Sequence, residues 1–274
     1  MKTREEWADR LMVPLYEKGY IETIWNTKSL KHQREGWRLK DGSWSPWFFN
    51  MRPIGSTSIL FFDICCAMAD LVKEHDLDMY IGIDMAGILP LGGVAVASAI
   101  RNAKPLSTGY TRPLSKKVRT PMEAFHLLQK MDGDVAGYGQ KDYVEAIMFD
   151  GMNIGIFDDM STGLGSKIIA RLIVLWEAKR RGLNVICNQI FYFLNRGAKN
   201  IQTGLDFAKE KEQGLSPEAL DVHYVLEFDE HLNDLRLVMA ASEFSIISDF
   251  QKNKSHFQDS VVQKKVLALA IATR

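Results

Sequence analysis

The sequence is poor in cysteine and has no net charge, and each absence narrows the possible functions. The three cysteines among its 274 residues supply neither a disulfide framework nor a metal-ligand spacing, so a reducing, cytoplasmic setting is expected. The 34 basic residues balance 34 acidic ones, which gives no support for binding through overall charge. We therefore expect neither nucleic acid nor a membrane surface as a partner.

The sequence also lacks a recognisable leader and a membrane-spanning run. Its opening residues, MKTREEWADR, are charged and contain no apolar core, so we expect no secretory signal. The most apolar stretch, IGIDMAGILPLGGVAVASAI, contains Asp84, Pro90 and several glycines. These residues favour a buried strand, a turn and a helix over a membrane span. At this length, one large α/β domain is sufficient.

Apolar strands alternate with helical segments along most of the chain. The patterns predict strands at 79–84, 107–111, 143–148, 153–159, 184–194 and 222–228. They predict helices at 3–19, 56–75, 203–213 and 230–240, and two more that end near residues 101 and 181. Such alternation predicts a mostly parallel sheet with helices on both faces.

Two segments depart from this alternation. Residues 36–52 predict a hairpin with a turn at Asp41-Gly42, because apolar residues flank the turn on both sides. Residues 112–142 are polar and predict a long loop, within which 120–131 is a candidate short helix. Long loops in compact domains are often mobile lids.

The segment IGIFDDMSTGLGSKI, residues 154–168, ends a buried strand on two acids and continues through a glycine-containing turn into a helix. Ligands of open parallel sheets bind at the carboxyl ends of strands. The turn's amides at a helix N-terminus suit a phosphate, while Asp158 and Asp159 suit a ribose diol or Mg²⁺ held through water. The alternative is that Asp158 caps the helix, Asp159 is solvated and the glycines merely form the turn. The segment has neither the P-loop motif nor the dinucleotide-binding motif.

This turn resembles the phosphoribosyl-pyrophosphate (PRPP) loop of type I phosphoribosyltransferases. Three further segments occur in the order of the orotate phosphoribosyltransferases. LKDGSWSPWFFNMR, residues 39–52, is similar to the family's N-terminal hairpin; IGIDMAGILPLG resembles its pyrophosphate-side loop; and VEA, residues 144–146, resembles the strand before the PRPP strand. The resemblance covers roughly residues 3–250, and the hairpin is its most specific part.

The resemblance implies an α/β, type I phosphoribosyltransferase-like fold with a mostly parallel sheet flanked by helices. It implies one domain over 1–250, with a hairpin-containing hood at 1–55 and a core at 56–250, followed by an extension of unknown role at 251–274. The implied activity transfers the 5-phosphoribosyl group from PRPP to orotate, giving orotidine 5′-monophosphate and pyrophosphate in pyrimidine nucleotide biosynthesis. Mg²⁺ is the implied cofactor, and a homodimer is the implied assembly.

The resemblance also implies the site residues. Asp158 and Asp159 would bind the ribose hydroxyls, balance the positive charge on the sugar and help to hold Mg²⁺; the other catalytic candidates are Arg112, Lys116 and Lys117. The remaining PRPP contacts would be Ser161, Thr162, Gly163, Leu164, Gly165, Ser166, Asp84, Met85, Ala86, Gly87 and Arg119. The base contacts would be Lys40, Phe48, Phe49 and Arg196. Alternatively, the two phenylalanines pack in the core and the cations are solvated.

Several positions depart from the family pattern. Pro113 stands where the catalytic loop has its second basic residue, and Leu164 stands where the PRPP loop has a glycine, which predicts a changed turn. Asn195 replaces an aspartate, and Asp41 replaces a serine. These departures leave two other hypotheses open. One is a phosphoribosyltransferase for another nucleobase, and the other is a non-catalytic regulator that binds PRPP or a nucleotide.

Overall fold

The computed structural model describes residues 2–39, 42–102, 104–131, 142–196 and 220–274. It divides into two compact units: Met1–Arg4 with Phe61–Glu227, and Glu5–Leu60 with Phe228–Arg274. Residues 228–274 thus group with the segment expected to form the hood, and the predicted single domain stays a prediction. The helix predicted at 203–213 lies outside the described residues.

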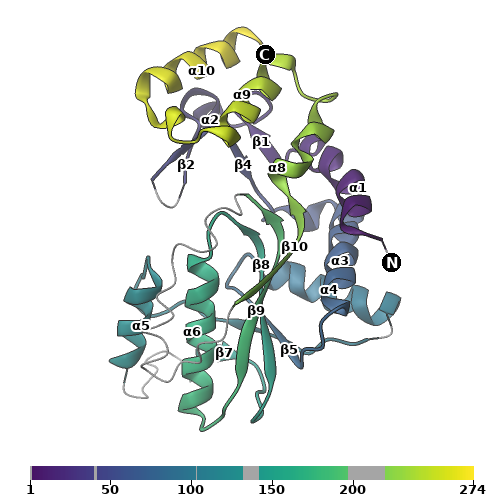
Figure 1. The fold of residues 1–274 in the computed structure, drawn as a ribbon, viewed down its shortest axis with the longest axis vertical. Helices are drawn as coiled ribbons and strands as arrows, with labels where there is room; N and C mark the ends of the chain where they lie inside the picture. Colours follow the sequence, from purple (N-terminus) through teal and green to yellow (C-terminus); the bar gives the residue numbers. More distant parts are fainter. Residues whose placement is uncertain (1, 40–41, 103, 132–141, 197–219) are drawn as a thin grey trace. The chain divides into compact units, whose positions relative to one another are not determined.

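The first unit is built on a six-stranded sheet with the strand order β10-β9-β8-β5-β6-β7 (Figure 1). The strands are β5 (Met79–Gly82), β6 (Thr108–Thr111), β7 (Val144–Glu145), β8 (Asn153–Ser161), β9 (Ile186–Asn195) and β10 (Asp221–Glu227). Neighbouring strands are parallel, except that β7 runs antiparallel to β6. The predicted mostly parallel sheet is confirmed, and the carboxyl ends of β5, β8, β9 and β10 meet at one edge.

Helices cover both faces of this sheet (Figure 1). They are α3 (Ser58–Lys73), α4 (Ile88–Asn102), α5 (Pro121–Gln129) and α6 (Gly165–Arg180). On the side of α5 and α6, alternate strand residues such as Ile81, Ile156 and Ile190 join the hydrophobic core. The short helix predicted within 112–142 is α5, which begins where the Thr120 hydroxyl accepts a bond from the Glu123 amide.

The second unit combines short strands with helices from both ends of the chain. Its elements are α1 (Arg4–Glu17), β1 (Ile21–Thr23), α2 (Leu30–Glu35), β2 (Trp37–Arg38), β3 (Trp44–Ser45), β4 (Trp47–Phe49), α8 (Phe228–His231), α9 (Ala241–Lys252) and α10 (Ser260–Ala272). The predicted hairpin is confirmed for β2 and β3, which pair antiparallel. β4 instead pairs with β1, so it is not an arm of that hairpin.

One helix prediction is wrong. The helix expected at 230–240 consists of the single turn α8, followed by a 3₁₀ turn at Leu232–Leu235. Asn233 and Asp234 lie in that turn, and these residue types compete with helical backbone bonds through their side chains.

Residues 228–274 contribute buried side chains to the second unit. The buried Glu243 of α9 accepts hydrogen bonds from the Tyr16 and Thr23 hydroxyls, at 2.9 and 2.5 Å. Trp47 stacks on Phe228 with ring centroids 3.8 Å apart. Within the described ranges, no helix combines the length and the apolar character needed to cross a bilayer.

Candidate active site

The two acids of the glycine-containing turn are buried at the end of the central strand β8. Asp158, Asp159 and Ser161 are all buried, and α6 begins only four residues after Ser161, at Gly165. The amide of Ile168 donates to the Leu164 carbonyl at 2.9 Å. The amides that precede Ile168 in the first turn have no carbonyl of the same helix to bind. Buried carboxylates and a helix end that attracts anions therefore lie together.

The turn leaves space above its backbone. Neither Gly163 nor Gly165 has a positive φ, and a Cβ placed on either would meet no atom within 4 Å. These glycines are therefore not required by backbone conformation or by packing. Their missing side chains leave the amide groups accessible to a ligand.

Leu164 is accommodated in this turn without strain. Its φ is −78°, which is in the right-handed region, so the residue bears no left-handed penalty. Its side chain is only 5% exposed and belongs to the same hydrophobic core as Ile168. The non-glycine residue thus anchors the turn to the core.

Lys167 is a site residue that the sequence did not reveal. Its side chain is only 4% exposed, and its Nζ lies 2.7 Å from Oδ2 of Asp158. The ammonium also donates to the Met160 carbonyl and lies 5.7 Å from the centroid of the Tyr192 ring. A lysine in the first turn of a helix that follows two buried acids was the available signal.

Burial changes the acidity of the acid pair. The pKa of Asp159 is raised from 3.8 to about 7, chiefly by burial and then by the charge of Asp158, while Lys167 opposes the rise. The Asp159 amide also donates to Oδ1 of Asp158 at 3.0 Å. Near neutral pH the pair therefore carries less than two full negative charges.

The turn expected to hold pyrophosphate lies beside the end of β8. The Ile83 amide donates to the Phe157 carbonyl at 2.9 Å, immediately before Asp158. A Cβ on Gly87 would lie 2.5 Å from that same carbonyl oxygen, so only glycine permits this close approach. The structure thus brings 84–87, which contains Asp84, Met85, Ala86 and Gly87, next to the acid pair.

A polar row continues along the carboxyl edge of the sheet. Ser161 on β8 is in register with Asn195 on β9, which is in register with Glu227 on β10. The side-chain amide of Asn195 donates from Nδ2 to Oε2 of the buried Glu227 at 2.7 Å. An aspartate at position 195 would place two carboxylates together. The predicted base contact Arg196 is buried at the end of this row, and its amide donates to the Ser161 carbonyl at 2.8 Å.

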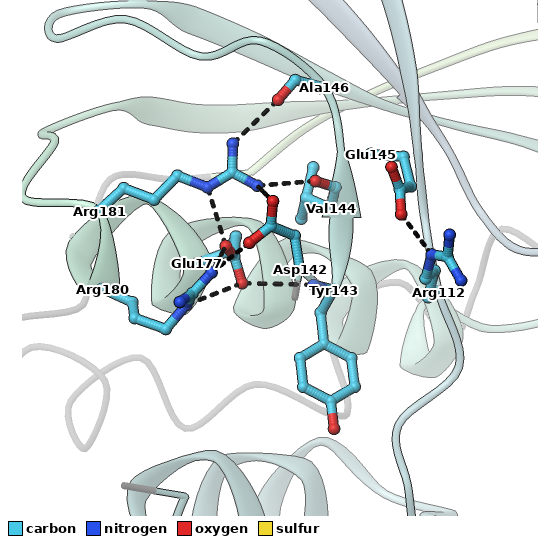
Figure 2. A network of polar contacts seen from close by, with 9 residues as sticks. All are labelled: Arg112, Asp142, Tyr143, Val144, Glu145, Ala146, Glu177, Arg180 and Arg181. Atoms are coloured by element: carbon cyan, nitrogen blue, oxygen red, sulfur yellow. Dashed lines mark hydrogen bonds and ion pairs between the residues drawn. The ribbon is translucent and has the colours of Figure 1, made fainter. Parts of the chain in front are cut away.

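The loop cations occupy two different environments. Arg112 lies at the start of the loop, where its Nε donates to Oε1 of Glu145 at 2.5 Å (Figure 2). Lys116, Lys117 and Arg119 are exposed. Leu114 and Val118, by contrast, pack against the hydrophobic core and hold this segment with its cations facing solvent. Residues 132–141 of the loop lie outside the described residues.

The returning end of the loop is fastened to the last turn of α6 (Figure 2). The fully buried Glu177 pairs with Arg180 and Arg181. Both arginines also reach Asp142, at 2.5 and 3.3 Å. Arg181 donates to the Val144 carbonyl at 2.8 Å as well. This network fixes the point at which the chain re-enters the sheet.

The aromatic residues expected to contact a base lie in the second unit, on β4. Because strand neighbours point to opposite faces, Trp47 and Phe49 are buried together while Phe48 lies on the other face. Phe48 stacks on Trp37 with ring centroids 6.2 Å apart and is only partly buried. Of the two predicted phenylalanines, Phe48 therefore has the surface to receive a ring. Lys40 lies outside the described residues.

The acid pair provides oxygen ligands but no closed metal cage. In the described part of the chain, no group of three or more His, Cys, Asp and Glu side chains is arranged to hold a metal ion. One oxygen of Asp158 is already bound to Lys167. Mg²⁺ usually keeps several waters and binds through one or two carboxylates plus substrate phosphates. The donor set therefore fits Mg²⁺ only as an ion shared with a phosphorylated ligand.

Comparison with known proteins gives similarity of fold. No family model matches the chain, and no curated protein matches it. The UMP synthase of Leishmania donovani superposes with a TM-score of 0.57 at 16% identity, over 90% of this chain but only 42% of that one. Orotate phosphoribosyltransferases from Francisella tularensis and Aeropyrum pernix give TM-scores of 0.49 and 0.48, at 13% and 15% identity, over 79% and 83% of this chain and 90% and 98% of theirs.

Proposed function

We propose that this protein is a phosphoribosyltransferase that transfers the phosphoribosyl group of PRPP to orotate, a step of pyrimidine nucleotide biosynthesis. One observation carries the proposal. A buried acid pair ends a central parallel strand, and an accessible glycine-containing turn at a helix N-terminus follows it directly. The similarity of fold to a UMP synthase supports the same proposed activity.

The geometry suggests a role for each part of the site. The turn 161–166 would bind the 5′-phosphate through backbone amides and through the Thr162 and Ser166 hydroxyls. Asp159 would hold the ribose hydroxyls, while Asp158 is already paired with Lys167. The acid pair would balance the positive charge that develops on the sugar as pyrophosphate departs. The turn 84–87 would receive the pyrophosphate.

Asp158 and Asp159 would help to hold Mg²⁺, and the ion would supply charge neutralisation for the leaving pyrophosphate. Lys116, Lys117 and Arg119 are exposed cations available to approach pyrophosphate from the loop. Arg112 would first have to leave Glu145. Closure of the loop over the site would exclude water from the reacting sugar.

For the acceptor, orotate is the leading candidate. The Arg196 guanidinium suits its carboxylate. Phe48, which belongs to the second unit, and Lys40, which lies outside the described residues, stay predicted contacts of the base. The Asn195–Glu227 pair favours a second candidate, a phosphoribosyltransferase for another nucleobase, because it changes the hydrogen-bonding groups at the end of β9. The ion pair between Arg112 and Glu145 favours a third candidate, a non-catalytic protein that binds PRPP, because it holds a predicted catalytic cation.

We also propose a homodimer, and the surface of α4 supports it. Leu89, Val96 and Ile100 are 49, 58 and 71% exposed and fall on one face of the helix, together with the exposed Gly92. A continuous apolar stripe of this kind marks an interaction surface. Because the stripe carries no charge, two copies can meet there about a two-fold axis without repulsion.

Turnover is the first test of the proposed function. Orotate consumption, measured with PRPP and Mg²⁺, is expected for the natural sequence and should be abolished in the double variant Asp158→Asn/Asp159→Asn. A panel of other nucleobases separates the second candidate from the first. Tight PRPP binding without turnover on any base would support the non-catalytic candidate and refute the transferase.

Sedimentation velocity tests the dimer. Val96→Glu should convert a dimer into a monomer, because it places a charge in the middle of the stripe. Leu237→Glu is the matched control, since Leu237 is 96% exposed and belongs to the second unit, whereas α4 belongs to the first. A dimer that survives the Val96 substitution would refute this interface.

A further inference from the structure

The candidate phosphate site poses an electrostatic problem. Two carboxylates at the end of β8 would repel a phosphate anion bound at the adjacent turn. Burial strengthens such repulsion, because the surroundings screen charge less than water does. A positive group close to the acids would remove the difficulty.

Lys167 supplies that positive group from within the chain. Its ammonium lies 2.7 Å from Asp158 Oδ2, and both side chains are almost fully buried. The Met160 carbonyl and the Ser166 hydroxyl, the latter at 3.4 Å, are its other polar contacts. Ser166 belongs to the turn expected to bind phosphate, so the ammonium contacts both Asp158 and a residue of that turn.

The position of Lys167 is unfavourable for a purely structural cation. It is the third residue of α6, where the partial positive charge of the helix N-terminus disfavours a lysine. A buried ion pair is also weak evidence for stability, because desolvation of both groups offsets their attraction. Two unfavourable terms at one residue are more readily explained by a role in binding an anion.

We infer that Lys167 is a positioning residue that cancels the charge of Asp158, so that the turn 161–166 accepts a phosphate without help from a divalent cation. Asp159 is then the acid left for the sugar hydroxyls. This inference rests on the proposed function, because it assigns a phosphate to that turn. It adds a residue and a metal-independent step of binding that the proposed function does not require.

Calorimetric titration of the full chain with ribose 5-phosphate, in the presence of EDTA, tests the inference. Lys167→Met should weaken binding by a factor on the order of ten or more, the equivalent of about 1.4 kcal/mol or more. Lys167→Met/Asp158→Asn should recover most of the affinity, since it removes both charges together. Lys179→Met is the matched control, because Lys179 is an exposed lysine on the same helix.

A second variant keeps the test decisive if Lys167→Met fails to fold. Asp158→Asn leaves the ammonium uncompensated, so the affinity for ribose 5-phosphate should rise. A purely structural pair predicts no change or a loss. Equal affinity of the natural sequence and Lys167→Met, or weaker binding by Asp158→Asn, would overturn the inference while leaving the proposed function intact. Failure of the natural sequence to bind ribose 5-phosphate or PRPP, even with Mg²⁺, would instead overturn the proposed function and any ligand role of Lys167 with it.

Discussion

Replacing Asp159 by asparagine is expected to stabilise the protein above pH 7 while removing an acid that the proposed reaction needs. The substitution keeps the size of the side chain and removes its charge. Burial is the largest cause of the raised pKa of Asp159, which means that the ionised form is costly in the folded protein. An asparagine avoids that cost.

The magnitude follows from the difference in pKa between the folded and unfolded chains. A rise from 3.8 to about 7 spans roughly three units, which corresponds to a ceiling of about 4 kcal/mol at 1.36 kcal/mol for each unit. Between pH 4 and pH 7 the folded chain holds a proton that the unfolded chain has released. The unfolding free energy is therefore not reduced by Asp159 below pH 4, where the residue is protonated in both states. It falls as the pH rises from 4 through 7.

Urea denaturation followed by circular dichroism, at intervals between pH 4.5 and pH 8.5, measures this effect. The difference in unfolding free energy between Asp159→Asn and the natural sequence should be smallest at the acid end and should reach roughly 1–4 kcal/mol above pH 7. Glu74→Gln is the control, because Glu74 is exposed and lies in the same unit; its difference should not follow this curve. A flat difference for Asp159→Asn, or destabilisation at pH 8, would refute the reasoning.

Three further substitutions test the packing around the site. Asn195→Asp should lower the unfolding free energy by roughly 1–3 kcal/mol at neutral pH, because it places a second carboxylate against Glu227, and adding Glu227→Gln should restore it in urea denaturation. Gly87→Ala should cost roughly 1–3 kcal/mol in thermal denaturation, since its Cβ would meet the Phe157 carbonyl at 2.5 Å. Glu177→Gln should cost roughly 1–3 kcal/mol and speed proteolysis between residues 112 and 142, because two arginines lose their buried partner.

Each of these expectations can fail in a defined way. Gly163→Ala is the control for Gly87→Ala, because a Cβ at position 163 meets nothing within 4 Å; equal losses of stability would contradict the close approach at Gly87. An Asn195→Asp variant that Glu227→Gln does not rescue would show that the loss has another cause. An unchanged rate of proteolysis in Glu177→Gln would show that the ion pairs of Glu177 do not control protease access to residues 112–142.

The sequence by itself determined the order of the strands in the chain and the position of the candidate site. Strand and helix periodicities are local, so the strands of the sheet and the helix that Gly182 ends were predicted from short windows. The turn after β8 was recognisable because its acids, glycines and hydroxyls are contiguous in the chain. Parallel topology then implied that 84–87 and the acid pair meet at one edge.

Tertiary structure decided which side chains face each other. Glu227 is distant from Asn195 in the chain, and only the pairing of β9 with β10 brings them together. The alternation along β4 separates Phe48 from Phe49, although they are neighbours in the sequence. No local pattern encodes these contacts, because each depends on the register between strands.

Leu164 and Lys167 show the same division within a single turn. From the sequence, Leu164 predicted a changed turn, because it stands where the resembled loop has a glycine. Lys167 was one lysine among several. In the folded chain, Leu164 enters the core and Lys167 neutralises Asp158. Burial and the distances between charges arise only when α6 packs on the sheet, so their effects on turn shape and acidity belong to the tertiary structure.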